Sequence, residues 1–375
     1  MSKSEKILIF TSVHDAFDSR IYEYQAKTLV EAGYEIILVA IDIHTHQTPD
    51  GICIIGIPKP KWRSGRLFNW FRFVKISFAQ KADIYHFHDP DLLPVGLFLK
   101  LLTQKPVIYD RHENYQEDIL FKEWIPKPLR YVISILFEKL EQFIASRLSA
   151  VIVIVDEHLV YFDNAITVHN YPKLEQFLEL SDVPRNSHKL IYTGGLGEDY
   201  GIQTLIRMLA LLKNQPVYLE LFGYYRENQA EVKAERLLCQ YKLGDDKFRF
   251  RGRIPYDEVR KQLVSAMAGL IALQDIPAFY TAFPRKMFEY MACGLPIIAS
   301  NLKAISRVIT DANCGILVEP DNPEAFAEAV TYLIDHPQES RAMGENGRRA
   351  VMEKYNWTGE AQKLLNLYQS LLKEA

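Results

Sequence analysis

The sequence predicts an α/β protein made of two doubly wound domains, and three observations support this. The chain has 375 residues, too many for one ordinary hydrophobic core and enough for two domains of usual size. Short apolar runs alternate with longer helical patterns along its whole length. The apolar runs are nearly continuous, as in parallel strands covered by helices on both faces. Alternation of this kind is typical of doubly wound parallel sheets.

The first half of the chain carries one full set of alternating elements. Its β-branched apolar runs predict strands at Ile7–Thr11, Glu35–Ile41, Ile52–Ile57, Ile84–His88, Val107–Asp110, Ala150–Val155 and Ile166–His169. Apolar residues at helical spacing predict helices at Arg20–Ala32, Leu67–Gln80, Asp91–Leu102 and Pro128–Leu148. These elements predict an N-terminal domain over residues 1–172.

The second half restarts the same alternation. Strands are predicted at Leu190–Thr193, Val217–Phe222, Phe248–Arg251, Gly269–Leu273, Ile297–Ser300 and Gly315–Val318. Helices are predicted at Gln203–Lys213, Gln229–Tyr241, Asp257–Ala266, Lys286–Ala292, Pro323–Asp335, Pro337–Lys354 and Thr358–Lys373. We assign a second domain to residues 189–357 and a linker to 173–188, which follows a turn signal at Pro172. The last helix, 358–375, has no strand partner, and we expect it to pack on the first domain.

Composition limits the class of protein. Apolar residues make up 48% and charged residues 24%, as in soluble globular proteins, and the net charge of −3 gives no reason to expect a nucleic-acid partner. The apolar run after Lys6 is too short for a signal peptide core. Scattered cysteines without a C-x-x-C pair favour reduced, buried thiols and a cytoplasmic location; they are Cys53, Cys239, Cys293 and Cys314.

Polar residues that directly follow predicted strands are candidate site residues, because ligands bind at the carboxyl ends of strands in such sheets. After the first strand, Asp18 and Ser19 fit a helix cap, while His14 or Arg20 could face a cleft between the two domains. It is equally possible that this loop only caps the helix that follows it.

The fourth and fifth strands are followed by further polar groups. His88 and Asp89 end the fourth strand and suit a proton acceptor and a hydroxyl clamp, although a solvated turn is the alternative. Asp91 fits a helix N-cap better than a metal ligand, so we predict no metal site. Asp110, His112 and Glu113 follow the fifth strand and predict acceptor recognition.

In the second domain, two segments suit a phosphate and a polyhydroxylated group. Gly194 and Gly195 lie between a strand and a helix, where glycine lets a ligand approach the backbone closely. In the segment Phe283–Ser300, Lys286 and Glu289 are three residues apart and share one face near the start of a short helix. The open N-terminus of that helix is a ready phosphate site.

The segment Lys59–Lys75 contains six basic residues, no acidic residue and five large aromatic residues. This composition suits the surface of an anionic membrane. An amphipathic helix packed on the sheet, with the aromatics as core, fits equally well. Both interpretations stay open at the level of sequence.

Taken together, these motifs resemble those of the retaining glycosyltransferases of family 4, which have the GT-B fold of two Rossmann-like domains facing a central cleft. The segment Phe283–Ser300 resembles that family's donor-site motif. The resemblance also rests on Leu190–Leu196, Gly201–Ile206, His86–Leu93, Tyr109–Glu113 and Gly315–Pro323, and it covers nearly the whole chain.

The resemblance implies transfer of a sugar from a nucleoside diphosphate sugar with retention of configuration. It implies that Glu289 holds the ribose hydroxyls and that His88 lies beside the reacting sugar. It implies no metal, no cofactor and no protein nucleophile, so that catalysis depends on positioning and on stabilising the leaving diphosphate. Backbone groups near Thr281, Phe283, Gly194 and Gly195 would hold the diphosphate and sugar.

Three departures from the family pattern change the expected distribution of charge. Thr281 stands where the family often has a second glutamate, and Gly195 and Tyr200 stand where it often has an arginine and a lysine. Pro284 also removes one backbone amide donor. We therefore expect Lys286 to neutralise the diphosphate, with Arg285, Arg253 and Arg20 as further candidates.

The sequence thus predicts a cytoplasmic glycosyltransferase that acts on a lipid-linked or surface-polysaccharide acceptor. Peripheral attachment to the inner face of the membrane would follow if the basic segment binds lipid. A GT-B-fold sugar-nucleotide epimerase and a non-catalytic sugar-nucleotide-binding relative are the alternatives.

Overall fold

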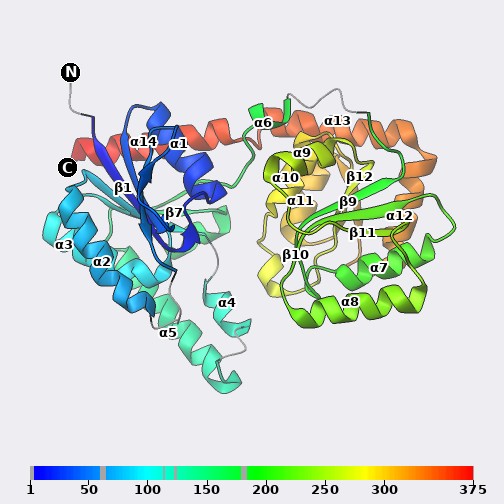
Figure 1. Ribbon diagram of the computed structural model, residues 1–375, viewed down its shortest axis with the longest axis horizontal. Helices are drawn as coiled ribbons and strands as arrows, with labels where there is room; N and C mark the ends of the chain where they lie inside the picture. Colours follow the sequence, from blue (N-terminus) through cyan, green and yellow to red (C-terminus); the bar gives the residue numbers. More distant parts are fainter. Residues whose placement is uncertain (1–3, 60–64, 113–114, 122–124, 179–183, 375) are drawn as a thin grey trace. The chain divides into compact units, whose positions relative to one another are not determined.

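The computed structural model describes residues 4–59, 65–112, 115–121, 125–178 and 184–374, and these form two compact units (Figure 1). The first unit comprises Met1–Asn170 together with Trp357–Ala375, and the second comprises Tyr171–Asn356. The last helix, α14 (Trp357–Glu374), therefore belongs to the first unit, where the Trp357 indole N–H donates to Thr28.

A mostly parallel sheet forms the centre of the first unit. Its described strands lie in the order β3-β4-β2-β1-β5-β6-β7-β8, and only the short edge strand β3 is antiparallel to its neighbour. The strands are β1 (Lys6–Asp15), β2 (Glu35–Ile41), β3 (His46–Gln47), β4 (Cys53–Ile57), β5 (Ile84–Phe87), β6 (Val107–Arg111), β7 (Ala150–Val153) and β8 (Ala165–Thr167).

Helices cover both faces of this sheet, as the continuous apolar strands predict. One face packs against α2 (Gly65–Gln80), α3 (Leu93–Thr103) and α5 (Lys127–Ala145). The other packs against α14, α1 (Lys27–Glu31) and η1 (Ser19–Ala26), a π-helical turn capped by the Asp18 carboxylate. The remaining elements are η2 (Pro90–Leu92), α4 (Tyr115–Phe121) and η3 (Asp156–Tyr161).

The second unit contains an entirely parallel sheet in the order β11-β10-β9-β12-β13-β14. Its strands are β9 (Lys189–Leu196), β10 (Tyr218–Tyr225), β11 (Phe248–Phe250), β12 (Ala268–Ile271), β13 (Ile297–Ser300) and β14 (Gly315–Val318). One core cluster joins α7 (Ile202–Leu211), α8 (Asn228–Tyr241) and α12 (Pro323–Asp335) to the sheet. The other joins α9 (Tyr256–Val264), α10 (Arg285–Ala292), α11 (Lys303–Ala312) and α13 (Pro337–Glu353). The short elements α6 (Glu175–Leu178) and η4 (Pro277–Phe279) complete the unit.

The strand order gives each sheet a point at which successive connections turn to opposite sides. In the first unit this point lies between β1 and β5, and in the second it lies between β9 and β12. Ligands of doubly wound sheets bind beyond the carboxyl ends of the strands at such points. The residues at the carboxyl ends of β1, β5, β9 and β12 are therefore the first candidates for a ligand-binding site.

Three expectations from the sequence need correction. The segment 303–312, which was not assigned a helix, forms α11, with Ile305 and Val308 buried in the core. Part of the expected linker, 173–188, packs on the second unit through Phe177. Asp91 is not an N-cap, because it lies inside η2 and accepts a hydrogen bond from the Ser12 hydroxyl at 2.8 Å.

Among the described residues, no helix is both long enough and apolar enough to span a membrane.

Candidate functional site

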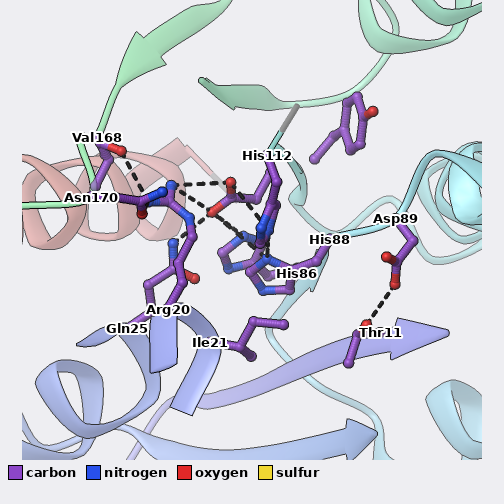
Figure 2. Close-up of polar contacts among 12 residues, drawn as sticks. Thr11, Arg20, Ile21, Gln25, His86, His88, Asp89, His112, Val168 and Asn170 are labelled. Atoms are coloured by element: carbon purple, nitrogen blue, oxygen red, sulfur yellow. Dashed lines mark hydrogen bonds and ion pairs between the residues drawn. The ribbon is translucent and has the colours of Figure 1, made fainter. Parts of the chain in front are cut away.

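In the first unit, Asp89 joins the ends of the two strands at the switch point. Its Oδ2 atom accepts a hydrogen bond from the Thr11 hydroxyl at 2.6 Å (Figure 2). It accepts another from the Ser12 amide, also at 2.6 Å. The carboxylate is only 2% exposed. Asp89 therefore holds β1 against the loop after β5, and the predicted role of hydroxyl clamp stays a prediction.

A buried carboxylate, Asp110, lies at the centre of the charged groups. The Arg20 guanidinium donates to both of its oxygens at 3.1 Å, and the Gln25 amide donates at 2.5 Å. Burial alone would raise the pKa of Asp110, but the positive charge of Arg20 holds it well below its usual value. Arg20 also donates to the Val168 carbonyl and to Asn170 (Figure 2). Both terminal nitrogens of the Arg20 guanidinium are thus engaged within this unit, and its predicted role as a further phosphate ligand stays a prediction.

Histidines surround the same carboxylate. His86 and His88 lie on the same side of the strand, as alternation predicts, with ring centroids 4.5 Å apart. His88 Nδ1 is 2.7 Å from His112 Nε2, and His86 Nδ1 is 2.6 Å from the Tyr368 hydroxyl of α14. Burial lowers the pKa of His88 well below its usual value and that of His112 to about 4, so both rings are neutral at pH 7.

The burial of His88 bears on its predicted place beside a reacting sugar. Its side chain is completely buried, whereas His112 and His14 are partly exposed and stack with ring centroids 5.3 Å apart. Of these three imidazoles, only His14, at 31% exposed, and His112, at 11%, reach the surface. Glu113 lies outside the described residues.

His86, His88 and Asp110 also form a group whose geometry could hold a metal ion, since one ligand atom from each lies within 4.8 Å of the others. The Arg20 guanidinium contacts both oxygens of that carboxylate, however. A cation placed there would compete with a fixed positive charge, so the group fits an ion-pair network better than a metal centre.

In the second unit, β9 ends at the switch point in a glycine-rich segment, residues 194–197, which we call the glycine loop; Gly194 and Gly195 were expected after the strand, but both still pair with β10. Gly194 has a φ of 111°, in the region that only glycine adopts easily. Gly201, the N-cap residue of α7, has a φ of 73°, and a Cβ atom there would lie 1.9 Å from the Ala272 carbonyl oxygen. Glycine at position 201 thus lets the start of α7 pack against the backbone of Ala272. At Gly194, the absence of a Cβ atom leaves the backbone next to Lys286 uncovered by a side chain.

Lys286 of α10 points at this glycine loop. Its Nζ atom lies 3.6 Å from the centroid of the Tyr192 ring and would lie 3.6 Å from a Cβ atom at Gly194. The Nζ atom is shielded from solvent and has no hydrogen-bond partner among the described residues. Burial lowers its pKa from 10.5 to about 7, and the nearby carboxylate of Glu289 only partly opposes this. A buried ammonium without an acceptor is costly, and an anion at the loop would remove that cost.

Glu289 lies one turn further along the same helix face and is buried. Its Oε1 atom accepts a hydrogen bond from the Tyr256 hydroxyl at 2.7 Å and forms an ion pair with Arg285 at 2.8 Å. A carboxylate has about four acceptor positions. Glu289 is therefore held in a fixed orientation and keeps acceptor capacity for a ligand hydroxyl.

The other predicted donor residues occupy separate places in this unit. Thr281 and Phe283 lie in the turn between η4 and α10, and the Arg307 guanidinium lies 5.2 Å from the Phe283 ring. Arg253 stacks over the Tyr224 ring at 3.9 Å. None of these observations tests their predicted contacts with a donor.

The sequence analysis missed Arg226, which lies against the glycine loop. A Cβ atom at Gly195 would lie 3.1 Å from its Cδ atom, and its guanidinium lies 4.9 Å from the Tyr200 ring. Arg226 directly follows β10, the neighbour of β9. The rule that polar residues follow strand ends would have found it if the strand had not been ended at Phe222.

Comparison with known proteins identifies the family. The model for group 1 glycosyl transferases matches residues 177–350, and the model for glycosyltransferase family 4 matches residues 19–158. The chain belongs to the family 4 glycosyltransferases of the GT-B fold. The family 4 match lies within the first unit of this glycosyltransferase, and the group 1 match lies within the second.

Individual relatives agree with this assignment. The MMP alpha-(1->4)-mannosyltransferase of Mycolicibacterium hassiacum is 28% identical over 46% of this chain, and the match spans only 40% of that relative. A solved structure of sucrose-phosphate synthase from Thermosynechococcus elongatus has a TM-score of 0.80 at 20% identity, covering 99% of this chain and 100% of that one. The Anabaena protein HepE, solved in complex with UDP-glucose, has a TM-score of 0.74 at 15% identity, covering 97% of this chain and 99% of that one. These structural likenesses show the fold of the glycosyltransferase.

Proposed function

We propose that this glycosyltransferase moves a sugar from a nucleoside diphosphate sugar to a lipid-linked or surface-polysaccharide acceptor, with retention of configuration. The observation that carries the proposal is the Lys286 ammonium, which is shielded, has no hydrogen-bond partner among the described residues and points at the glycine loop at the end of β9. A diphosphate at that loop would supply its missing partner.

The residues of the second unit divide the work of donor binding. Lys286 would neutralise the charge that develops on the leaving diphosphate, so that the reaction proceeds without a metal ion. The open backbone at Gly194 and Gly195 would let the phosphates approach closely. Glu289, fixed by Tyr256 and Arg285, would accept hydrogen bonds from the two ribose hydroxyls. Arg226 would add a second positive charge at the outer side of the loop.

We propose uridine as the base of the donor. The support for uridine is that the structurally similar Anabaena protein HepE was solved in complex with UDP-glucose. The family model and the mannosyltransferase relative support a sugar donor in general. Retention of configuration rests on the family resemblance alone.

In the first unit, we assign contact with the acceptor to His14 and His112. Both side chains are partly exposed, and their rings stack on one another. His88 would position His112 through the hydrogen bond between their rings. Asp110 and Arg20 would keep this arrangement fixed.

The proposal is tested by measuring UDP release from UDP-sugars with and without an acceptor glycan. Glu289→Gln keeps the size of the side chain but removes its charge, and we expect donor use to fall by about two orders of magnitude because buried hydroxyls lose a charged acceptor. Glu235→Gln, at an exposed position of α8, is the control. Normal donor use by Glu289→Gln would show that the donor is bound elsewhere.

The same assay separates the alternatives. An epimerase forms a new sugar nucleotide without any acceptor, and a non-catalytic relative binds UDP without releasing it from any UDP-sugar. A glycosyltransferase releases UDP at a rate that depends on the acceptor.

A further inference from the structure

Helix α5 carries most of its large apolar residues on the outside. Five of them, spaced three or four residues apart, are between 50% and 62% exposed, while Ser134 and Glu141 are buried. This spacing places the apolar side chains in one stripe along the helix. A helix packed on a core has the opposite arrangement. The stripe consists of Leu129, Val132, Leu136, Leu140 and Phe143.

The buried polar residues explain why α5 does not turn its stripe inward. Glu141 accepts a hydrogen bond from the Tyr109 hydroxyl at 2.7 Å and pairs with Arg111 at 3.1 Å. The Ser134 hydroxyl donates to the Gln116 carbonyl at 2.9 Å. Rotating the helix would leave the Arg111 and Glu141 charges buried without each other, which costs several kcal/mol in proteins. The outward stripe is therefore fixed by the fold.

The apolar surface continues onto the two neighbouring helices. Helix α3 contacts both α2 and α5, and the three lie on the same face of the sheet (Figure 1). We call the stripe of α5 together with the exposed large apolar side chains of α2 and α3 the outer apolar surface. From α2 and α3 it includes Phe71, Phe78, Phe98, Leu101 and Leu102. A surface of this extent on a soluble unit marks a binding face.

The charges on this surface are positive. Helices α2 and α3 contain no acidic residue, and Arg72 and Lys75 are exposed between Phe71 and Phe78. On α5, Lys139 adjoins the stripe, and just beyond the end of the helix the Arg147 guanidinium lies 3.5 Å from the centroid of the Phe143 ring.

The acidic residues of α5 are directed elsewhere. Glu141 is buried, and Glu138 accepts a hydrogen bond from the Gln116 side chain at 2.7 Å. The outer apolar surface therefore combines apolar side chains with basic ones alone.

We propose that the outer apolar surface docks on an anionic lipid bilayer. Leucine and phenylalanine side chains would enter the interfacial layer, while the lysine and arginine side chains contact lipid phosphates. A second copy of the chain fits less well, because a two-fold contact would bring like charges together. The inference deepens the proposed function, and it rests on that function where it places the acceptor in the membrane.

This surface refines the interpretation of the segment Lys59–Lys75. Residues 60–64 lie outside the described part of the chain. In the described part, Phe73 is buried in the core, whereas Phe71, Arg72 and Lys75 are exposed. The segment thus supplies both core and surface, and the larger share of the outer apolar surface comes from α5.

Vesicle flotation of the full chain tests the proposal. We compare vesicles of phosphatidylcholine alone with vesicles that contain phosphatidylglycerol as well. We expect binding only to the anionic vesicles, with less binding at high salt. The triple variant Leu136→Gln, Leu140→Gln, Phe143→Gln should lower the bound fraction about ten-fold or more at a fixed lipid concentration. The charge variant Arg72→Glu, Lys75→Glu should lower the bound fraction as well. Because it changes α2 and leaves α5 intact, its result does not depend on whether the triple variant folds.

A matched control uses exposed apolar residues of the second unit. Leu211, Val232 and Met352 are between 52% and 54% exposed, and their combined change to glutamine should leave vesicle binding unaltered. Equal binding by the wild type and the triple variant would overturn the proposal. A wild-type dimer in lipid-free solution that the triple variant abolishes would also overturn it, in favour of self-association.

UDP binding separates this inference from the proposed function. The triple variant should show the same thermal shift with UDP as the wild type, because its changes are confined to α5. If UDP shifts neither protein, the proposed function fails while the vesicle result still stands.

Discussion

The two switch points of this glycosyltransferase are built alike but hold their charges differently. Beyond β1 and β5, the buried charges satisfy one another, since Arg20 pairs with Asp110 and neutral histidines surround them. Beyond β9 and β12, the loop is lined by glycine, and the Lys286 ammonium has no hydrogen-bond partner among the described residues. The same topology thus supports a buried ion-pair network in one unit and a buried ammonium without an acceptor in the other.

This difference shows how buried charge can be used for two purposes. A paired charge fixes local structure, and removing one partner exposes the full desolvation cost of the other. An unpaired charge is a cost to the free protein that a ligand can remove. Removing a charge in the first unit should therefore lower the stability of the protein. Removing the Lys286 charge in the second unit should instead weaken ligand binding.

The largest effect is expected for Arg20→Ala. It leaves the fully buried Asp110 carboxylate without its charged partner and should lower the free energy of unfolding by about 3–5 kcal/mol. Urea unfolding measures this loss, with the exposed Arg236→Ala as control. The double variant Arg20→Ala, Asp110→Asn should recover part of the stability. A loss below about 1 kcal/mol in the single variant would contradict the paired network.

The next largest effect is expected for Lys286→Met. Affinity for UDP should fall about 10- to 100-fold, because the diphosphate loses a charge-assisted hydrogen bond, while affinity for uridine should change little. Calorimetry with both ligands measures this difference, and Lys213→Met is the exposed control. The free energy of unfolding should be unchanged or higher, unlike that of the Arg20 variant. Equal losses for UDP and uridine would count against a phosphate role.

The smallest effect concerns pH. The pKa of Lys286 is lowered to about 7 by burial, so the free protein loses the ammonium as the pH rises above that value. A bound diphosphate favours the charged form, so UDP affinity should fall between about pH 7.5 and 9, by at most about ten-fold per unit. Binding should also take up a proton from the buffer.

Lys286→Arg is the matched control for the pH prediction, because a guanidinium stays charged over this range. Its UDP affinity should be nearly independent of pH. If the wild type shows the same flat profile, the Lys286 ammonium is not the group that titrates.

The sequence predicted most elements of the fold, and two of the features that it missed have identifiable reasons. Helix α11 carries buried residues at Ala304, Ile305, Val308 and Ile309, a helical spacing that was overlooked between two strong strands. Strand β10 extends to Tyr225, beyond the predicted end at Phe222, because pairing with β9 continues into the glycine loop. Strand ends depend on partners that are distant in the chain, so sequence patterns locate them poorly.

The candidate site residues also divide into those that the sequence predicted and those that it did not. Glu289 and Lys286 were found because their spacing on one short helix is a local property. The pairing of Arg20 with Asp110, the contact of His88 with His112 and the place of Arg226 were not predicted. Each joins residues from elements that meet only in the folded sheet.

The sequence by itself determined the two doubly wound units, the glycine loop and the Lys286–Glu289 motif, since apolar periodicity and short motifs are encoded locally. Only the tertiary structure decided which charges are satisfied and which remain available to a ligand. It also showed that α5 turns its leucines outward, because the buried pair of Arg111 and Glu141 fixes the rotation of that helix. Burial and pairing depend on what packs against each residue, and the linear pattern does not contain that information.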